Sequence, residues 1–251
     1  VKTATRNAVY IFFTTILISS LCAQTVSKRT VAILDFNNNS IVDKEKLEPL
    51  RKGLSEILIT EMSQIETFNI VEREKLRELV TEQEFGQSEM VDQASAQKMG
   101  KLLGAQNLLF GAFVHSFGEK IRVDVRIVEV ETGRTLRAVE ETGDLEDIFD
   151  IVKELTKKIS KQLKVEMTKE DLERQKSRSA ADNFEATLAY SKAIDFEDLG
   201  RQYAKQAKSG DARSMYQKAV EFLKLTLNKS PKFKDAQEKL EELQAKLREL
   251  K

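Results

Sequence analysis

Histidine and cysteine, which are common in catalytic and metal-binding sites, are scarce in this chain. His115 is the only histidine and Cys22 the only cysteine among 251 residues. His115 lies beside a predicted turn at the end of an apolar run, a position where a lone histidine is usually structural, and one cysteine is too few for a typical zinc site. A Ser-His-Asp relay would have to use His115, and no G-x-S-x-G elbow occurs. We therefore expect no catalytic and no metal-binding residues.

Signatures of cofactor and nucleic-acid binding are also missing. Neither G-x-x-x-x-G-K-[ST] nor G-x-G-x-x-G occurs, so no phosphate-bearing cofactor is expected. Lysine plus arginine equals aspartate plus glutamate at 41 each, and such a balanced charge gives no general attraction to nucleic acid. We expect the Glu72-Arg73 pair to bond backbone groups where a strand passes into a helix.

The first residues predict export. A basic start is followed by an apolar run from Ala8 to Leu21 and then by small residues. This order is typical of a secretory signal peptide over residues 1–23, which leaves a periplasmic mature protein; an uncleaved membrane anchor is the alternative. Cys22 is the candidate lipidation site, but Ser19 and Leu21 occupy the lipobox positions in reversed order. Ordinary cleavage is the favoured prediction.

The mature chain is organised around residues 104–139, where three apolar runs are joined by two tight turns. Each turn contains a glycine, Gly118 or Gly133, that can adopt the positive φ of a tight reversal. In the middle run, apolar side chains alternate with charged ones. The alternating apolar residues are Ile121, Val123, Val125 and Ile127. A period of two predicts an antiparallel strand with one buried face.

Elements on either side complete an α/β pattern. Residues 30–36 and 68–71 predict two buried strands, and the apolar spacing between 47 and 65 predicts a helix that joins them in a parallel crossover. A polar loop is expected at 37–40. Further helices are expected over 72–83, 92–104 and 144–163. The predicted fold class is α/β, with a mixed sheet in a domain over residues 30–163.

Composition changes beyond this domain. Charged residues dominate 164–182, which predicts a linker or a solvated helix. Residues 183–251 contain no strand-like run and predict an all-α region.

The ordered set of elements resembles the CsgG family of curli-secretion proteins and its periplasmic relatives. The matching residues are Val31-Ala32-Ile33-Leu34-Asp35-Phe36, Ile70-Val71-Glu72-Arg73, Leu76, Glu82-Gln83, Gly100, Leu103-Gly104-Ala105, Leu109-Phe110-Gly111 and Val128-Glu129-Val130-Glu131-Thr132-Gly133. This resemblance implies a CsgG-like mixed-sheet domain over about residues 30–163.

One departure from the family bears on function. The family's secretion channel is similar to this domain with two long membrane hairpins inserted. The corresponding stretches here, 116–120 and 136–144, are expected to be a tight turn and a short charged loop. A membrane-spanning strand needs about nine to eleven residues with an apolar side, so we expect this version to lack the pore.

The helical region resembles a tetratricopeptide repeat. Phe196, Leu199-Gly200 and Tyr203 match the first helix of that motif, in which a small residue lets the paired helix approach closely. The second helix is matched by Tyr216, Ala219, Phe222, Leu227 and Pro231. The turn between them, 208–214, is expected to be longer than the motif's standard. One complete repeat is short of the usual stable minimum, so support from the first domain, a cap at 183–193 or a partner is expected.

We therefore predict a non-enzymatic periplasmic scaffold or adaptor of the cell envelope. Its helical tail would bind a protein partner, with Phe196, Tyr203 and Tyr216 as candidate contact residues. A homo-oligomer is an option, nucleic acid is not expected as a partner, and membrane contact is at most peripheral or through a lipid anchor. The alternative is an accessory or ring-forming component of an outer-membrane secretion system, anchored at Cys22.

Overall fold

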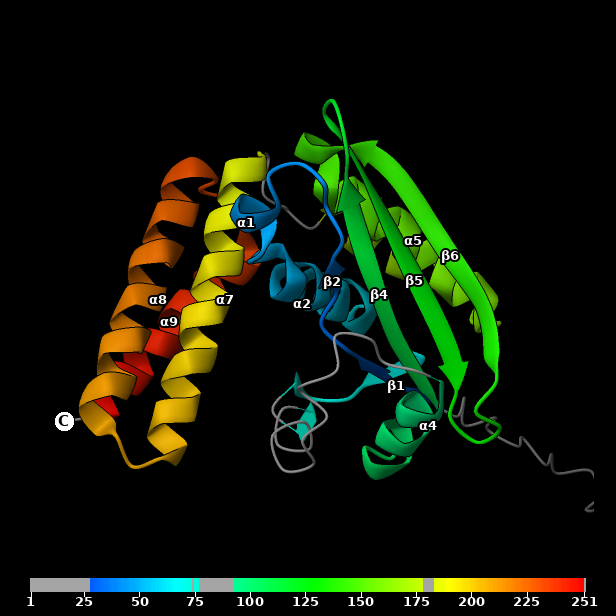
Figure 1. The fold of residues 1–251 in the computed structure, drawn as a ribbon, viewed down its shortest axis with the longest axis horizontal. Helices are drawn as coiled ribbons and strands as arrows, with labels where there is room; N and C mark the ends of the chain where they lie inside the picture. The colour runs from blue at the N-terminus through cyan, green and yellow to red at the C-terminus, as the bar shows by residue number, and fades with distance from the viewer. Residues whose placement is uncertain (1–27, 74, 77–92, 178–182, 251) are drawn as a thin grey trace, which may run out of the picture.

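The computed structural model describes residues 28–73, 75–76, 93–177 and 183–250. The predicted signal peptide, Cys22 and most of the predicted helix over 72–83 lie outside these residues. Within them the fold is α/β, with one mixed sheet followed by a helical C-terminal part. Figure 1 shows the sheet on one side and three long helices on the other.

The sheet joins parallel and antiparallel strands. Its strands are β1 (Arg29–Ile33), β2 (Asn37–Asn38), β3 (Phe68–Ile70), β4 (Asn107–His115), β5 (Lys120–Glu129) and β6 (Thr135–Asp144). The order is β3-β1-β4-β5-β6, with β2 also paired to β4. Strand β1 runs parallel to β3 and β4, whereas β4, β5 and β6 form an antiparallel meander. The mixed sheet predicted from the sequence is confirmed. Both hairpin glycines adopt positive φ, 87° at Gly118 and 71° at Gly133.

The third strand of the predicted meander is present but continues past residue 139 through residues expected as a loop, and the polar loop expected at 37–40 contains a short strand. Residues 136–144 belong to β6, which pairs with β5 from Lys120 opposite Asp144 to Val128 opposite Thr135. Asn37 and Asn38 continue the direction of β1 as β2 and pair with β4. Both predictions were wrong for one reason. These strands lie at the margins of the sheet and bury few side chains, so they lack an apolar alternation.

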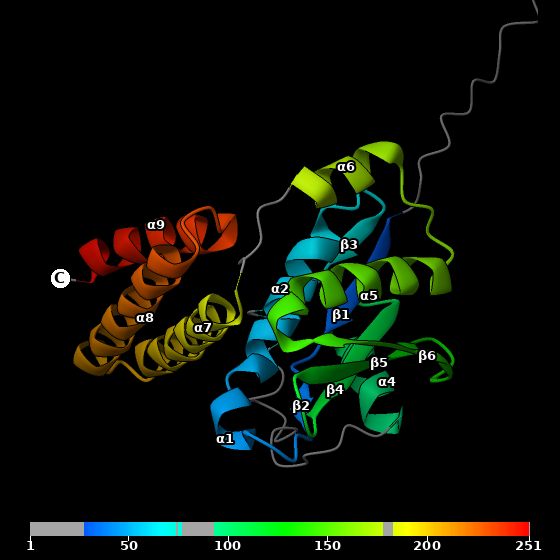
Figure 2. The ribbon, with the colours of Figure 1, turned by 90° about the horizontal axis from the view of Figure 1, so that it is seen from above.

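Helices cover both faces of the sheet. On one face pack α2 (Leu50–Ser63) and α5 (Ile148–Gln162), and on the other lies α4 (Gln93–Leu102) (Figure 2). A short α1 (Lys44–Leu47) precedes α2, because Pro49 interrupts the predicted single helix. Successive side chains of β1 and of Leu34, the residue after it, pack alternately on the two faces of the sheet. Val31 and Ile33 belong to the core on the α2 side, whereas Ala32 and Leu34 belong to the core on the α4 side.

The charged stretch after α5 contains a helix, α6 (Lys169–Ser177). Two reciprocal hydrogen bonds cap the start of this helix. The Asp171 amide donates to Thr168 Oγ1 over 3.0 Å, and the Thr168 amide donates to Asp171 Oδ2 over 2.9 Å. Gln175 is buried and donates to the Lys153 carbonyl of α5 at 3.5 Å. Part of the predicted linker is therefore a packed helix.

Three helices form the C-terminal part: α7 (Phe184–Lys205), α8 (Ser209–Lys229) and α9 (Lys234–Glu249). Because α8 begins at Ser209, only residues 206–208 separate it from α7, and the long turn predicted at 208–214 is wrong. The predicted cap at 183–193 is the first half of α7. Asn183 is the N-cap of this helix, and its side chain accepts from the Ala186 amide over 2.7 Å.

The main core runs without interruption from the sheet into these helices. Phe233, which precedes α9, meets Phe149 of α5 edge-on at 5.2 Å and Tyr190 of α7 at 4.8 Å between ring centroids. All three rings are buried. Burial of such a side chain stabilises the fold by about 1.5 to 3 kcal/mol, so the tail is fixed to the α/β part by shared apolar packing.

Candidate interaction site

The predicted contact residues fall into two groups. Phe196 and Tyr203 of α7 are half-buried, so part of each ring reaches the surface. Tyr216 is fully buried. A Cβ added at Gly200 would lie 2.7 Å from the Tyr216 ring, so α7 and α8 touch there, as predicted for this glycine. Tyr216 is therefore an interhelical packing residue, and its assignment as a partner contact is corrected.

Phe196 belongs to an aromatic pair that the sequence prediction missed in part. Its ring stacks on Phe222 of α8 with centroids 5.4 Å apart and planes 13° from parallel. Leu199 and Leu225 lie one turn further along their helices and are 38% and 41% exposed. Figure 1 shows α7 and α8 side by side on the margin away from the sheet.

Two lysines cover this pair. The ammonium group of Lys218 lies 5.3 Å from the Phe196 centroid, and that of Lys192 lies 5.7 Å from the Phe222 centroid. Both distances are within the range of cation–π attraction. We call the set the outer face; it comprises Lys192, Phe196, Leu199, Lys218, Phe222 and Leu225.

Opposite the outer face, α7 packs against α2 at close range. A Cβ added at Gly53 would lie 1.8 Å from Ser191 Oγ, so glycine is required for this approach. Beside it, Lys52 Nζ lies 2.9 Å from Asp195 Oδ1 and 3.2 Å from Asp198 Oδ2. Burial would lower the pKa of Lys52, but Asp198 and Asp195 raise it above its ordinary value.

Arg73 is at the centre of the same contact. Its guanidinium lies 2.9 Å from both Asp35 Oδ1 and Glu56 Oε2, 3.8 Å from Asp198 Oδ2, and donates to the Lys52 carbonyl at 3.2 Å. Burial opposes the charge, yet these carboxylates raise the pKa of Arg73 further. Arg73 therefore bonds a carbonyl of α2 and not the strand-to-helix junction expected for the Glu72–Arg73 pair, and its ion pairs dominate.

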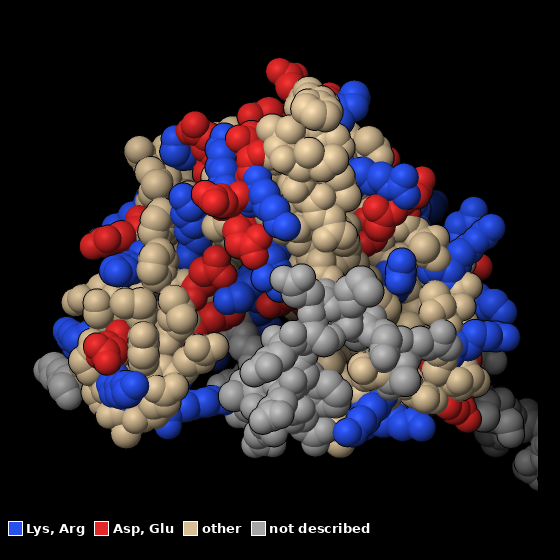
Figure 3. All heavy atoms as spheres, in the orientation of Figure 1, with Lys and Arg blue, Asp and Glu red and all other residues tan. Residues whose placement is uncertain are grey.

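The network continues into the last helix. Lys239 of α9 reaches Glu197 Oε2 at 3.0 Å and Glu56 Oε1 at 3.4 Å, so Glu56 joins Arg73 to Lys239. Glu197 is buried, which raises its pKa, but Lys239 and Arg201 lower it below the ordinary value. In Figure 3, acidic and basic side chains are interspersed along the line where the tail meets α2. We call this set the junction network: Asp35, Lys52, Glu56, Arg73, Asp195, Glu197, Asp198 and Lys239.

His115 lies at the end of strand β4. It is buried, its Nδ1 lies 3.0 Å from the Lys120 carbonyl, and its amide donates to Ser40 Oγ over 3.1 Å. It therefore braces the β4–β5 hairpin against the loop after β2. Across the described ranges, no group of three His, Cys, Asp or Glu side chains is placed to hold a metal ion.

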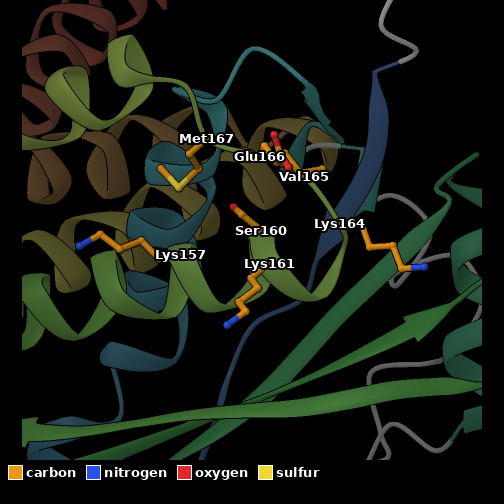
Figure 4. Close-up of a pocket in the computed structure, with 7 residues that line it drawn as sticks. All are labelled: Lys157, Ser160, Lys161, Lys164, Val165, Glu166 and Met167. Carbon is orange, nitrogen blue, oxygen red and sulfur yellow. The ribbon is translucent and has the colours of Figure 1, made fainter.

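An open pocket of about 570 Å³ lies at the end of α5. Its lining residues are Lys157, Ser160, Lys161, Lys164, Val165, Glu166 and Met167. Figure 4 shows the three lysine side chains pointing away from one another, so they do not converge on one anion. Ser160 is buried and donates to the Thr156 carbonyl over 2.8 Å. No helix in the described part of the chain combines the length and apolar character needed to cross a bilayer.

Solved structures with a partly similar backbone fold include three bacterial proteins. The LpoB C-terminal domain from Salmonella enterica has 14% identity and a TM-score of 0.32, covering 49% of this chain and 87% of its own. TolB from Acinetobacter baumannii has 13% identity and a TM-score of 0.38, covering 54% and 28%. A PelC dodecamer from Paraburkholderia phytofirmans has 12% identity and a TM-score of 0.37, covering 56% and 91%.

A curated relative is "Putative adenylate cyclase 3" of Rhizobium meliloti (strain 1021), which is 26% identical over 159 residues, or 63% of this chain. The chain spans a quarter of that relative's length, 25%. The family model described as "Curli production assembly/transport component CsgG" matches residues 18–122, so this part of the chain is similar to the CsgG family.

Proposed function

We propose that the protein is a non-enzymatic scaffold or adaptor of the cell envelope, which holds a protein partner on its helical tail. One observation carries this proposal. The tail is fixed to the CsgG-like domain by a shared core and the junction network, while the outer face of α7 and α8 keeps aromatic and aliphatic side chains at the surface.

The arrangement of charges supports a binding role over a catalytic one. The buried ionisable groups of the junction network pair with one another across α2, α7 and α9. Such pairs fix how the tail is oriented on the domain. A partner held on the outer face would then keep a defined position relative to the sheet.

The envelope location is proposed from the predicted signal segment over 1–23 together with the CsgG-like domain. The candidate lipidation at Cys22 and the oligomeric state belong to the same proposal. They concern how the scaffold is retained in the envelope, whereas the outer face concerns what it holds.

In-cell photo-crosslinking tests the proposal. A benzophenone amino acid in place of Leu225 is expected to capture one reproducible envelope protein, because this side chain is exposed beside the aromatic pair. The same group in place of Lys164, exposed at the end of α5, is the matched control. Combining the Leu225 probe with Phe196→Ala should abolish the product. Equal products from both positions, a product that survives Phe196→Ala, or a cytoplasmic partner would contradict the proposal.

A further inference from the structure

The outer face is built from a repeat within the chain. Residues 190–199 read Y-S-K-A-I-D-F-E-D-L, and residues 216–225 read Y-Q-K-A-V-E-F-L-K-L. Both segments fit Y-x-K-A-[IV]-[DE]-F-x-x-L, one in α7 and the other in α8.

Equivalent positions have equivalent environments in the two helices. The tyrosine, alanine and isoleucine or valine are buried in both, the phenylalanines are half-buried, and the leucines are exposed to 38% and 41%. Since α7 and α8 are antiparallel neighbours, each lysine reaches the ring of the opposite helix: Lys192 covers Phe222 and Lys218 covers Phe196. The outer face is thus locally close to two-fold symmetric about the stacked rings.

The two charged residues in the set that defines the outer face are both lysines. Within the described ranges, neither Lys192 nor Lys218 forms an ion pair, and each contacts a ring instead. Attraction to a ring at the surface is worth about 0.5 to 1 kcal/mol and leaves most of the ammonium free to meet a carboxylate. A partner with carboxylates on both sides of an apolar side chain would match the two lysines and the rings between them.

We infer that the outer face binds an acidic peptide segment in which an apolar side chain lies between carboxylates. This inference rests on the proposed adaptor function and names the chemistry of its partner. A second copy of the chain is disfavoured as the occupant, because two such faces would bring lysines together. An anionic membrane is disfavoured because the rings lie flat on each other and only two leucines protrude, whereas membrane-surface helices present a wide apolar face.

Peptide binding to the full chain tests the inference. The probe is a fluorescein-labelled peptide with the core Glu-Glu-Leu-Phe-Glu-Glu, compared with versions in which every Glu is replaced by Gln or by Lys. Fluorescence anisotropy is expected to show that only the acidic peptide binds and that added salt weakens binding. The double variant Lys192→Glu/Lys218→Glu should weaken it by about tenfold or more, since two favourable charge contacts become repulsive.

Lys224→Glu is the matched control, because Lys224 is exposed on α8 but covers neither ring. It should leave binding unchanged, and an unfolding curve of each variant should show that it is fully folded at the assay temperature. Equal binding of the acidic and Gln peptides, equal weakening by Lys224→Glu, binding to phosphatidylglycerol vesicles in place of the peptide, or concentration-dependent dimers lost in the double variant would each overturn the inference.

The two proposals can fail separately. If photo-crosslinking from position 225 captures a partner but the acidic peptide shows no preference, the adaptor function stands and the partner chemistry is wrong. If the acidic peptide binds through both lysines but no partner is captured, the peptide-binding chemistry stands and the adaptor function is wrong.

Discussion

The two sides of helix α7 differ in a way that reverses the usual distribution of side chains. Towards α2, α7 presents the half-buried Asp195 and the buried Asp198 to Lys52. Towards solvent it presents Phe196 and Leu199 beside the matching residues of α8. Charged groups are therefore concentrated at an internal contact, and apolar groups are left at the surface.

The two sides of α7 therefore suit different tasks: one orients the helical tail on the α/β domain, and the other can bind a partner. Buried ion pairs contribute little net stability compared with apolar packing, but they penalise any docking that leaves a charge unpaired. An exposed apolar patch has the opposite character: it adds little to the fold and is typical of an interaction site. The inner side of α7 thus determines where the tail sits, and the outer side remains available to a partner.

The largest expected effect comes from removing the central cation of the inner side. Arg73→Ala leaves Asp35 and Glu56 without their shared guanidinium. Breaking a buried pair in this way costs about 3 to 5 kcal/mol of unfolding free energy, which urea unfolding followed by circular dichroism measures.

Arg122→Ala is the control for Arg73→Ala, since Arg122 also pairs with two carboxylates but on the exposed face of strand β5. Its unfolding midpoint should stay at the wild-type value. If both variants shifted the midpoint equally, the contrast between buried and exposed charges would be refuted.

The aromatic residues give the next contrast. Tyr216→Ala opens a cavity at the contact between α7 and α8 and should lower the unfolding free energy by about 3 kcal/mol. Phe196→Ala removes a half-buried ring from the outer face and should cost about 1 kcal/mol while abolishing crosslinking from position 225. Thermal melts of the two variants check these two losses of stability. A larger loss for Phe196→Ala would make the outer face part of the core.

The smallest expected effect is a dependence on pH. Because Lys239 and Arg201 outweigh burial, the pKa of Glu197 in the folded state is below the ordinary 4.5. Its contribution to stability is therefore present above that value and is lost as pH falls through the folded-state pKa. Glu197→Gln should lower stability at neutral pH and flatten its decline in acid, as urea midpoints measured down to about pH 3 would show.

Glu185→Gln is the matched change at an exposed pair, because Glu185 meets Lys229 at the surface. Solvent screening should leave its acid profile close to that of the wild type. A profile altered as much as that of Glu197→Gln would remove the distinction between the two sides of α7.

Much of the fold follows from local patterns. The alternation of Ile121 to Ile127 predicts β5 because a strand with one buried face must repeat every two residues. The apolar residues of α5 recur every three to four positions, which predicts a helix with one buried face. The third run of the meander predicted the start of β6, but its end, residues 140–144, escaped prediction because none of these residues is buried and their sequence carries no such alternation.

The candidate site was partly predictable. Phe196 was recognised through its resemblance to a repeat motif, and its partner Phe222 could have been found by aligning residues 190–199 with 216–225. Tyr216 was misassigned because periodicity identifies a helical face without saying which neighbour covers it. Arg73 stood out in the sequence, but its partners Asp35 and Glu56 lie 38 and 17 residues away and follow no motif.

The sequence by itself determined most elements of the α/β domain, the helical nature of the tail and the scarcity of histidine and cysteine, because these depend on residue type and on spacing along a few turns or strands. Only the tertiary structure decided that the tail shares one core with the domain, that Arg73 joins them and that two distant lysines cover one pair of rings. Those contacts join residues far apart in the chain, and their energies exist only once the backbone has brought the groups together and excluded water.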